Sequence, residues 1–302
     1  MSEIPEPSRT GTVTFGPYET WYRVTGEIGG GPTPLVVLHG GPGACHDYTL
    51  RIARVAETGR AVVHYDQVGC GRSTHRPDAP IDFWNVDLFL DELDNLLGAL
   101  GIGDDYHVLG QSWGGMLGAE HAVRAPAGLR SIVISNSPAS MPLWLEGANR
   151  LRAELPEPVR AALDRHEAAG TLEDPEYLDA TDEYYARHVC RVVPNPPEVL
   201  SSKALINEDP TVYTTMNGPN EFYCVGTLKD WTVIDRLAGV VAPTLLVSGR
   251  YDEATPEAVR PFFEHIPDVR WEVLAESSHM PFIEETDEYL RIVSSFLGEH
   301  DG

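Results

Sequence analysis

Hydrophobic residues in the first half of the chain gather in short runs that alternate with longer amphipathic stretches. The runs are nearly continuous in hydrophobicity, which is typical of strands buried on both faces of a sheet. They fall at residues 34–38, 61–65, 106–109 and 131–134. Residues 85–100 place apolar side chains at helical spacing. This succession of strands and helices predicts a mostly parallel α/β sheet with right-handed crossovers.

The α/β pattern extends at both ends of this region. Two earlier segments, residues 12–15 and 20–24, are expected to form an antiparallel hairpin that leads into the sheet. The pattern also returns after about residue 236, where further strands and helices are expected. The strands fall at residues 244–247 and 270–274, and the helices at residues 257–265 and 286–297.

Residues 140–235 interrupt this rhythm. No strand-like run stands out there, and prolines separate the helical segments. Carboxylates and aromatic residues crowd together at residues 173–185, and we interpret most of these charges as a solvated helical face. The sequence therefore predicts a core formed by residues 1–139 and 236–302, with residues 140–235 inserted as a helical cap.

Composition narrows the range of functions. The chain has 302 residues, with 22 basic and 46 acidic side chains and a net charge of −24. Such a surface repels phosphate backbones and anionic membranes, so we expect neither nucleic acid nor a membrane as a partner. The N-terminal sequence MSEIPEPSRT lacks the features of a secretory signal, and four cysteines show no CxxC spacing. We expect a cytoplasmic protein with reduced thiols, no metal site and no cofactor.

The strongest chemical signal is the segment Gly-Gln-Ser-Trp-Gly-Gly at residues 110–115. It follows the apolar run at residues 106–109 and opens a helical stretch, which is the context of a nucleophile elbow. The flanking glycines permit a sharp turn with a strained serine backbone. We therefore predict that Ser112 is a nucleophile exposed at the carboxyl end of a central strand.

A serine nucleophile needs a base and an orienting carboxylate, which follow it in the order acid, then histidine, in sheets with such an elbow. His279 lies in a loop just after the predicted strand at residues 270–274 and is the expected base. Asp252 and Glu253 both follow the strand at residues 244–247. We expect Asp252 to orient the histidine, because its shorter side chain is easier to fix. Glu253 is then left for another task.

The loop Leu-His-Gly-Gly-Pro-Gly at residues 38–43 is the expected source of an oxyanion donor. We predict that the N–H groups of Gly41 and of Trp113, the residue after the nucleophile, form the pair. His39 and Asp66 carry the right chemistry for a triad, but neither follows the elbow in the chain. We interpret both as residues that organise loops.

Taken together, HGGPG at residues 39–43, DQVGCGRS at 66–73, GQSWGG at 110–115 and the proline-rich insertion resemble the proline iminopeptidase family of α/β-hydrolases. The resemblance covers nearly the whole chain. Residues 216–222 and 226–231 are similar to a segment of the tricorn-interacting aminopeptidase and the L-amino-acid amidases. This resemblance implies an α/β-hydrolase fold with an inserted helical cap.

The resemblance also implies a function. By motif position, Glu221 and Glu253 match two glutamates that bind the free α-amino group of the substrate in this family. The implied activity is that of a serine aminopeptidase or amidase, which releases an N-terminal amino acid from a small peptide or aminoacyl amide through an acyl-enzyme. The alternatives are removal of an aminoacyl group from a small-molecule amide, a carboxylesterase, and a non-catalytic binding protein of the same fold. The preferred N-terminal residue and the oligomeric state stay open.

Overall fold

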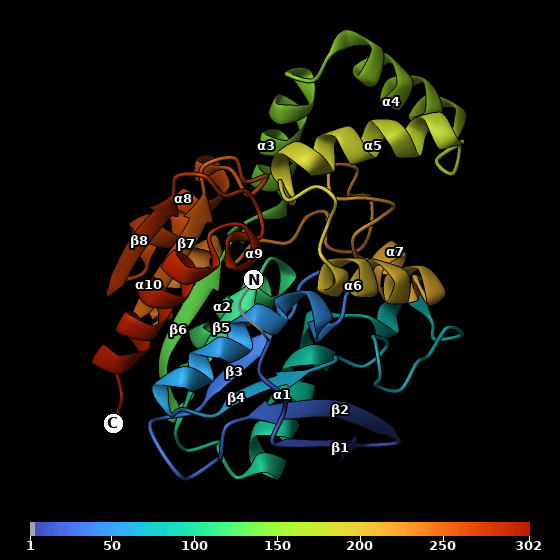
Figure 1. The fold of residues 1–302 in the computed structure, drawn as a ribbon. Coiled ribbons are helices and arrows are strands. Elements are labelled where there is room, and N and C mark those ends of the chain that lie inside the picture. Colours follow the sequence, from blue (N-terminus) through green and yellow to red (C-terminus); the bar gives the residue numbers. More distant parts are fainter. Residues whose placement is uncertain (1–3) are drawn as a thin grey trace.

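The computed structural model describes residues 4–302 and is built around one eight-stranded sheet (Figure 1). The strand order is β1-β2-β4-β3-β5-β6-β7-β8. The first two pairings, β1 with β2 and β2 with β4, are antiparallel, and all others are parallel. The strands are β1 Arg9–Phe15, β2 Tyr18–Thr25, β3 Leu35–Leu38, β4 Val62–Tyr65, β5 Tyr106–Gln111, β6 Leu129–Ser135, β7 Thr244–Gly249 and β8 Val269–Leu274.

All the strands expected from the hydrophobic runs are confirmed, with ends that move by at most three residues. The hairpin at the start of the chain is confirmed as the antiparallel pair β1 and β2. Pro34 lies just before β3, where its lack of an N–H removes no ladder hydrogen bond. The mostly parallel α/β sheet predicted from the pattern is therefore present.

The expected helices are also confirmed. The first, α1, begins after Asn85, whose side chain accepts a hydrogen bond from the N–H of Leu88, and ends at Gly101 in the left-handed conformation. The longer helices of the core are η1 His46–Thr58, α1 Val86–Leu100, α2 Trp113–Val123, α8 Pro256–His265 and α10 Thr286–Glu299. Shorter turns are η2 Ile81–Phe83, η3 Ile234–Gly239 and α9 Pro281–Glu284. The sequence pattern did not predict η1.

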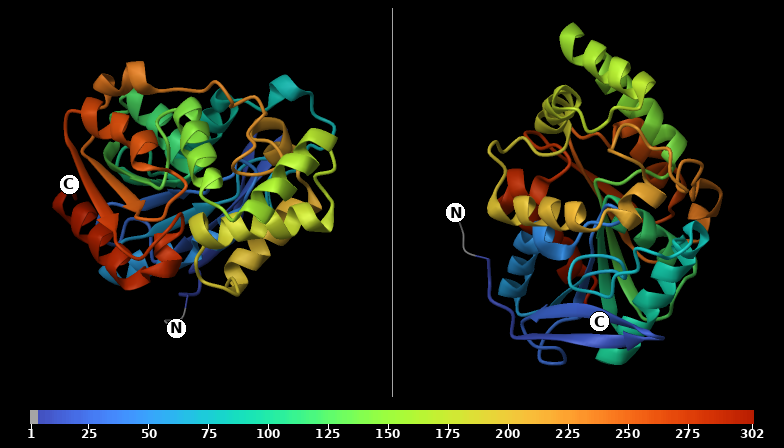
Figure 2. Two further views of the ribbon diagram at one scale, coloured as in Figure 1. Left: turned by 90° about the horizontal axis from the view of Figure 1, so that it is seen from above. Right: turned by 90° about the vertical axis from the view of Figure 1, so that its right-hand side faces the viewer.

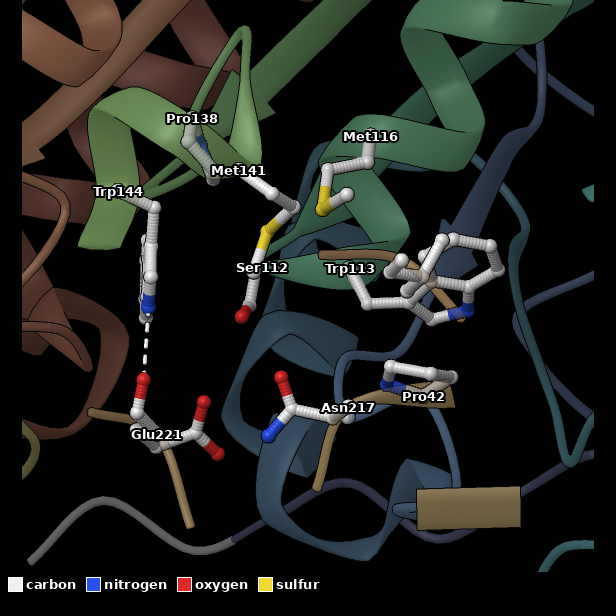
Figure 3. A pocket seen from close by; sticks show the side chains of 11 residues that line it. Pro42, Ser112, Trp113, Met116, Pro138, Met141, Trp144, Asn217 and Glu221 are labelled. Atoms are coloured by element: carbon white, nitrogen blue, oxygen red, sulfur yellow. Dashed lines mark hydrogen bonds between the residues drawn. The ribbon is translucent and has the colours of Figure 1, made fainter. Parts of the chain in front are cut away.

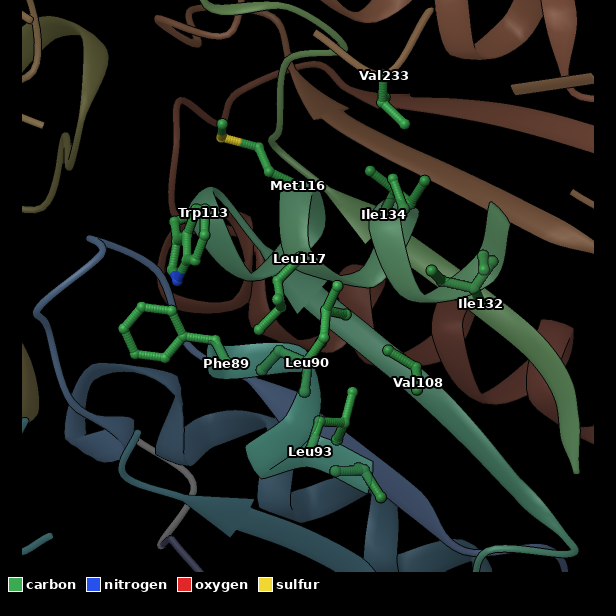
Figure 4. Close-up of a cluster of buried hydrophobic side chains, with 14 of the residues drawn as sticks. Phe89, Leu90, Leu93, Val108, Trp113, Met116, Leu117, Ile132, Ile134 and Val233 are labelled. Atoms are coloured by element: carbon green, nitrogen blue, oxygen red, sulfur yellow. The ribbon is translucent and has the colours of Figure 1, made fainter. Parts of the chain in front are cut away.

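Alternate residues of the central strands face two helical layers. Val36 and Leu38 of β3 share a buried cluster with residues of α1, α2 and α8. Leu35 and Val37 of the same strand lie in a second cluster with η1 and α10. Figure 4 shows the first cluster, in which α1 and α2 pack over β5 and β6. Burial on both faces explains why the strands read as continuous apolar runs.

Helices α3 to α7 follow one another between β6 and β7 and rise above the carboxyl end of the sheet (Figures 1 and 2). Their bounds are α3 Met141–Ala153, α4 Glu157–Ala169, α5 Pro175–His188, α6 Pro197–Glu208 and α7 Thr211–Met216. The first three share a small buried cluster of their own. An isolated antiparallel bridge joins Ser140 to Thr232, close to the two ends of the expected insertion. The division at residues 140 and 235 stays a prediction.

Candidate active site

The turn between β5 and α2 holds Ser112 in a backbone conformation that is rare for a side chain of its kind, with φ 55° and ψ −124°. Space around the turn is tight. A Cβ at Gly114 would lie 2.0 Å from the carbonyl oxygen of Leu38, and one at Gly110 would lie 2.0 Å from the carbonyl oxygen of Gly114. Only glycine fits these two positions, because any side chain there would overlap nearby backbone atoms.

His279 and Asp252 meet although they come from separate loops, after β8 and β7. Asp252 Oδ1 accepts a hydrogen bond from His279 Nδ1 at 2.7 Å and another from the N–H of Ala254 at 2.9 Å. Its Oδ2 accepts one from Asn136 Nδ2 at 2.6 Å. Both side chains are nearly fully buried. Three donors hold the carboxylate of Asp252 in one orientation. Because His279 uses its Nδ1 for the bond to Asp252, its Nε2 is available for another partner.

A hydrogen-bond network ties the loop after β3 to the serine turn and the histidine. The hydroxyl of Tyr48 accepts a hydrogen bond from the N–H of Gly40 at 2.6 Å and donates one to Gln111 Oε1. Gln111 Nε2 in turn donates to the carbonyl oxygen of His279 at 3.0 Å. Three separate loops are thereby held in register at the carboxyl end of the sheet.

Gly41 and Trp113 both line the cavity that Ser112 faces. Gly41 has a φ of 111°, a conformation that favours glycine. Between residues 4 and 302, neither the N–H of Gly41 nor that of Trp113 donates a hydrogen bond. Two backbone donors are thus free beside the serine, as an oxyanion site requires.

Glu253 is the most unusual carboxylate of the site. Its side chain is 0% exposed, and neither carboxylate oxygen accepts a hydrogen bond within residues 4–302. Its Oε1 lies 3.9 Å from Nε2 of His279. Burial, reinforced by the nearby carboxylates of Glu221 and Asp252, raises the pKa of Glu253 well above its ordinary value, although the neighbouring hydroxyl of Tyr184, which itself has no hydrogen-bond partner within residues 4–302, acts in the opposite direction. A buried carboxyl group without a partner is costly, and such a cost is typical of a site that awaits a ligand.

Glu221, in the segment between α7 and η3, lines the cavity beside Ser112. Its Oε1 accepts a hydrogen bond from the hydroxyl of Tyr213 at 2.7 Å, and its carbonyl oxygen accepts one from Trp144 Nε1 at 2.8 Å. Burial raises the pKa of Glu221. The two glutamates, 32 positions apart in the chain, therefore lie near each other, with Glu221 lining the cavity at Ser112 and Glu253 buried beside His279.

The cavity beside Ser112 is narrow, at about 10 Å³, which is room for about one water molecule. Figure 3 shows Trp144 and Glu221 on one side of Ser112, with Trp113 and Pro42 on the other. Met141 and Met116 also line the cavity and lie on the side of Ser112 that is opposite Glu221 and Asn217. The ring of Trp144 also packs edge-on against His279, with ring centres 5.7 Å apart. The pocket is therefore apolar apart from its few convergent polar groups.

Comparison with known proteins agrees with this geometry. The profile of the family described as the alpha/beta hydrolase fold matches residues 33–286. The chain is 37% identical over 293 residues to a proline iminopeptidase from Clostridium botulinum strain Hall, covering 96% of this chain and 98% of that protein. The chain belongs to the proline iminopeptidase family of α/β-hydrolases. The resemblance and the fold class inferred from the sequence motifs are confirmed.

Solved structures extend this likeness to three dimensions. The crystal structure of a proline iminopeptidase from Mycobacterium smegmatis superposes with a TM-score of 0.91 at 58% identity, covering 97% of this chain and 98% of that one. The crystal structure of VinJ superposes with a TM-score of 0.97 at 54% identity, covering 98% and 100% of the two chains. In both comparisons the inserted helices are included in the match, because nearly the whole chain is covered.

The two residues set aside as loop organisers have that role. His39 Nε2 accepts a hydrogen bond from the N–H of Gln67 at 3.0 Å. Asp66 is fully buried and accepts hydrogen bonds from the N–H groups of His46 and Arg72 at 2.8 and 2.9 Å. Asp66 also lies near Cys45 in a cluster with metal-binding residue types, but protein donors already occupy its oxygens.

Sequence reasoning missed several side chains of the site, namely Tyr48, Gln111, Asn136, Trp144 and Tyr213. Gln111 belongs to the elbow motif, so its position could have been noticed. The other four lie in segments that carry no motif, and their roles depend on contacts between distant parts of the chain. Within residues 4–302 no helix is long and apolar enough to cross a membrane. The cytoplasmic location stays a prediction.

Proposed function

We propose that this protein is a serine aminopeptidase, which removes the N-terminal residue from a small peptide or aminoacyl amide. The observation that carries the proposal is the fully buried carboxylate of Glu253, which accepts no hydrogen bond within residues 4–302 and lies beside His279 and near Glu221. A substrate ammonium group is the partner that such a pair of carboxylates lacks. Membership of the proline iminopeptidase family supports this assignment.

In the proposed reaction, Glu221 and Glu253 bind the α-ammonium group and thereby orient the adjacent carbonyl group toward Ser112. The Ser112 hydroxyl attacks the carbonyl carbon while His279 accepts its proton, and Asp252 holds the histidine in the required tautomer. The N–H groups of Gly41 and Trp113 stabilise the oxyanion.

His279 then protonates the leaving amine, so the C–N bond breaks and the acyl-enzyme remains. A water molecule gives a proton to His279 and attacks the ester carbonyl; the bond to Ser112 Oγ then breaks, and His279 returns the proton to Oγ as the amino acid is released. The inserted segment of residues 140–235 acts as the cap, because it supplies Trp144 and Glu221 to the lining of the cavity at the serine. A peptide entering by an internal segment would leave the carboxylates unpaired, so cleavage is restricted to the first residue.

Paired substrates test the role of the glutamates. Glu253→Gln should lower kcat/KM for alanine p-nitroanilide by about 100-fold, because it removes a charge-assisted contact with the ammonium group. Hydrolysis of p-nitrophenyl butyrate, which has no amine, should fall far less. Ser112→Ala serves as the control and should abolish both activities. Equal losses on both substrates in Glu253→Gln would contradict an amine-binding role.

A further inference from the structure

A second and much larger hollow lies next to the catalytic cavity. It has a volume of about 510 Å³, against about 10 Å³ for the cavity at Ser112. Its floor is formed by Trp84, Met216 and Leu228, which are buried, and its rim includes Ile81, which is 67% exposed. This volume is within the range of roughly 300 to 1,000 Å³ that is usual for small-ligand sites. We call this hollow the outer groove.

The outer groove and the catalytic cavity share a wall, because Leu228 lines both. A chain of aromatic contacts also joins them. The ring of Trp113 lies 5.7 Å from that of Phe89, which stacks at 6.4 Å on Trp84 of the groove floor. Trp113 and Glu221 lie on opposite sides of Ser112 (Figure 3). The outer groove is therefore on the side of the serine that faces away from the amine-binding glutamate.

The positions of Glu221, Ser112 and the outer groove define how a substrate would be oriented. With its ammonium group at Glu221 and its carbonyl group at Ser112, an extended substrate would continue toward Leu228, the wall that the cavity shares with the outer groove. We propose that the outer groove binds the residue that follows the scissile bond and selects a large apolar side chain there. This inference rests on the proposed aminopeptidase function. A groove of this size with a mostly apolar lining fits substrates whose leaving amine carries a large apolar side chain.

Charge on the groove adds a second element of selectivity. Asp82 and Asp230 line the outer groove, and both are exposed. A free dipeptide carries its C-terminal carboxylate on the residue that would occupy the groove, where it meets these like charges. The amide of the same dipeptide has no such charge. We therefore expect C-terminally amidated or longer peptides to be cleaved better than free dipeptides.

The test compares two substrate series on the full-length protein. In the first, alanine is followed by ammonia, glycinamide or phenylalaninamide, and in the second, glycine, alanine or leucine precedes a constant glycinamide. The wild-type kcat/KM for alanyl-phenylalaninamide should exceed that for alanyl-glycinamide by about tenfold, the discrimination that an apolar pocket commonly gives. Replacing a groove residue by a larger one, Thr227→Trp or Val86→Trp, should bring this ratio close to one.

Controls on surface positions separate the groove from general effects. Val241→Trp adds the same bulk at a residue that is 73% exposed and does not line the groove, so the ratio should persist. Asp82→Asn should narrow the gap between alanyl-phenylalaninamide and free alanyl-phenylalanine. Asp104→Asn, at an exposed position outside the groove, should leave that gap as it is.

Each result decides between the two claims. A wild-type ratio near one, or a ratio that neither bulky variant alters, would overturn the groove assignment while leaving the aminopeptidase function intact. A change confined to the glycine, alanine and leucine series would assign the groove to the first residue of the substrate instead, and so also overturn the proposal. If no free-amine substrate is hydrolysed, the proposed function fails, and the groove assignment fails with it.

Discussion

At the scale of single residues, the chemistry of the site concentrates on two carboxylates with opposite surroundings. Asp252 accepts three hydrogen bonds and orients His279, whereas Glu253, the next residue, accepts none. The sequence identified both as acids after one strand, and the shorter side chain of Asp252 suggested that it would orient the histidine. It could not predict Asn136 as a donor to Asp252, because 116 positions separate the two residues.

Trp144 contacts both Glu221, through its N–H, and His279, through its ring. Trp144→Phe keeps an aromatic ring against His279 but removes the hydrogen bond to the carbonyl oxygen of Glu221. We expect the KM for alanine p-nitroanilide to rise about fivefold with a smaller change in kcat, since one neutral hydrogen bond contributes about 1 kcal/mol. Steady-state kinetics on this substrate and on p-nitrophenyl butyrate measure the effect.

Trp144→Leu is the matched comparison, because it removes both the N–H and the ring. It should lower kcat as well, including that for the butyrate ester, through the lost contact with His279. If Trp144→Phe instead weakened ester and anilide hydrolysis equally, the tryptophan would have only a packing role.

At the scale of helices and strands, hydrophobic periodicity was sufficient for the sheet and the flanking α-helices. Strands buried on both faces read as apolar runs, and α1 shows its cap residues in the sequence. The turn-like helix η1 was missed because buried polar residues, including His46, Asp47 and Thr49, interrupt its pattern. Those side chains form hydrogen bonds and do not build an apolar face, so hydrophobic periodicity does not predict this helix.

Helix α1 also carries a buried acid that links it to the sheet. Glu92 accepts hydrogen bonds from the hydroxyl of Thr20 at 2.5 Å and from the N–H of Val68 at 3.0 Å. Burial raises the pKa of Glu92 to about 8. The folded protein therefore holds a proton that the unfolded chain releases above about pH 4.3. Its contribution to stability is complete at low pH and is lost as the pH rises toward 8.

Glu92→Gln tests this linkage, because glutamine keeps an acceptor oxygen without the titrating proton. The wild-type free energy of unfolding should lose roughly 2 to 3 kcal/mol from this group between pH 5.5 and pH 8. The variant should show a correspondingly flatter pH dependence in urea titrations. Asp91→Asn, at an exposed position on the same helix, is the control and should keep the wild-type slope. The same slope in Glu92→Gln would mean that Glu92 is already ionised.

At the scale of the whole molecule, the site combines residues from the core with residues from the segment between β6 and β7. Trp144 and Glu221 come from segments at either end of the inserted helices, whereas Ser112, Asp252 and His279 come from three strand ends of the core. The motif resemblance predicted that Glu221 and Glu253 would act together. Neither the proximity of the two glutamates nor the outer groove could be derived from the sequence, since both depend on how helices α3 to α7 and the segment after them pack onto the core.

The proposed function requires a free amine on the substrate for turnover. The most direct test is the hydrolysis of alanine p-nitroanilide and its N-acetyl derivative by the wild-type protein under identical conditions. Acetylation removes the positive charge and leaves the scissile bond unchanged, so the proposed ionic contact with Glu221 and Glu253 is lost. We predict turnover of alanine p-nitroanilide and none of its N-acetyl derivative. Comparable rates for the two would contradict it.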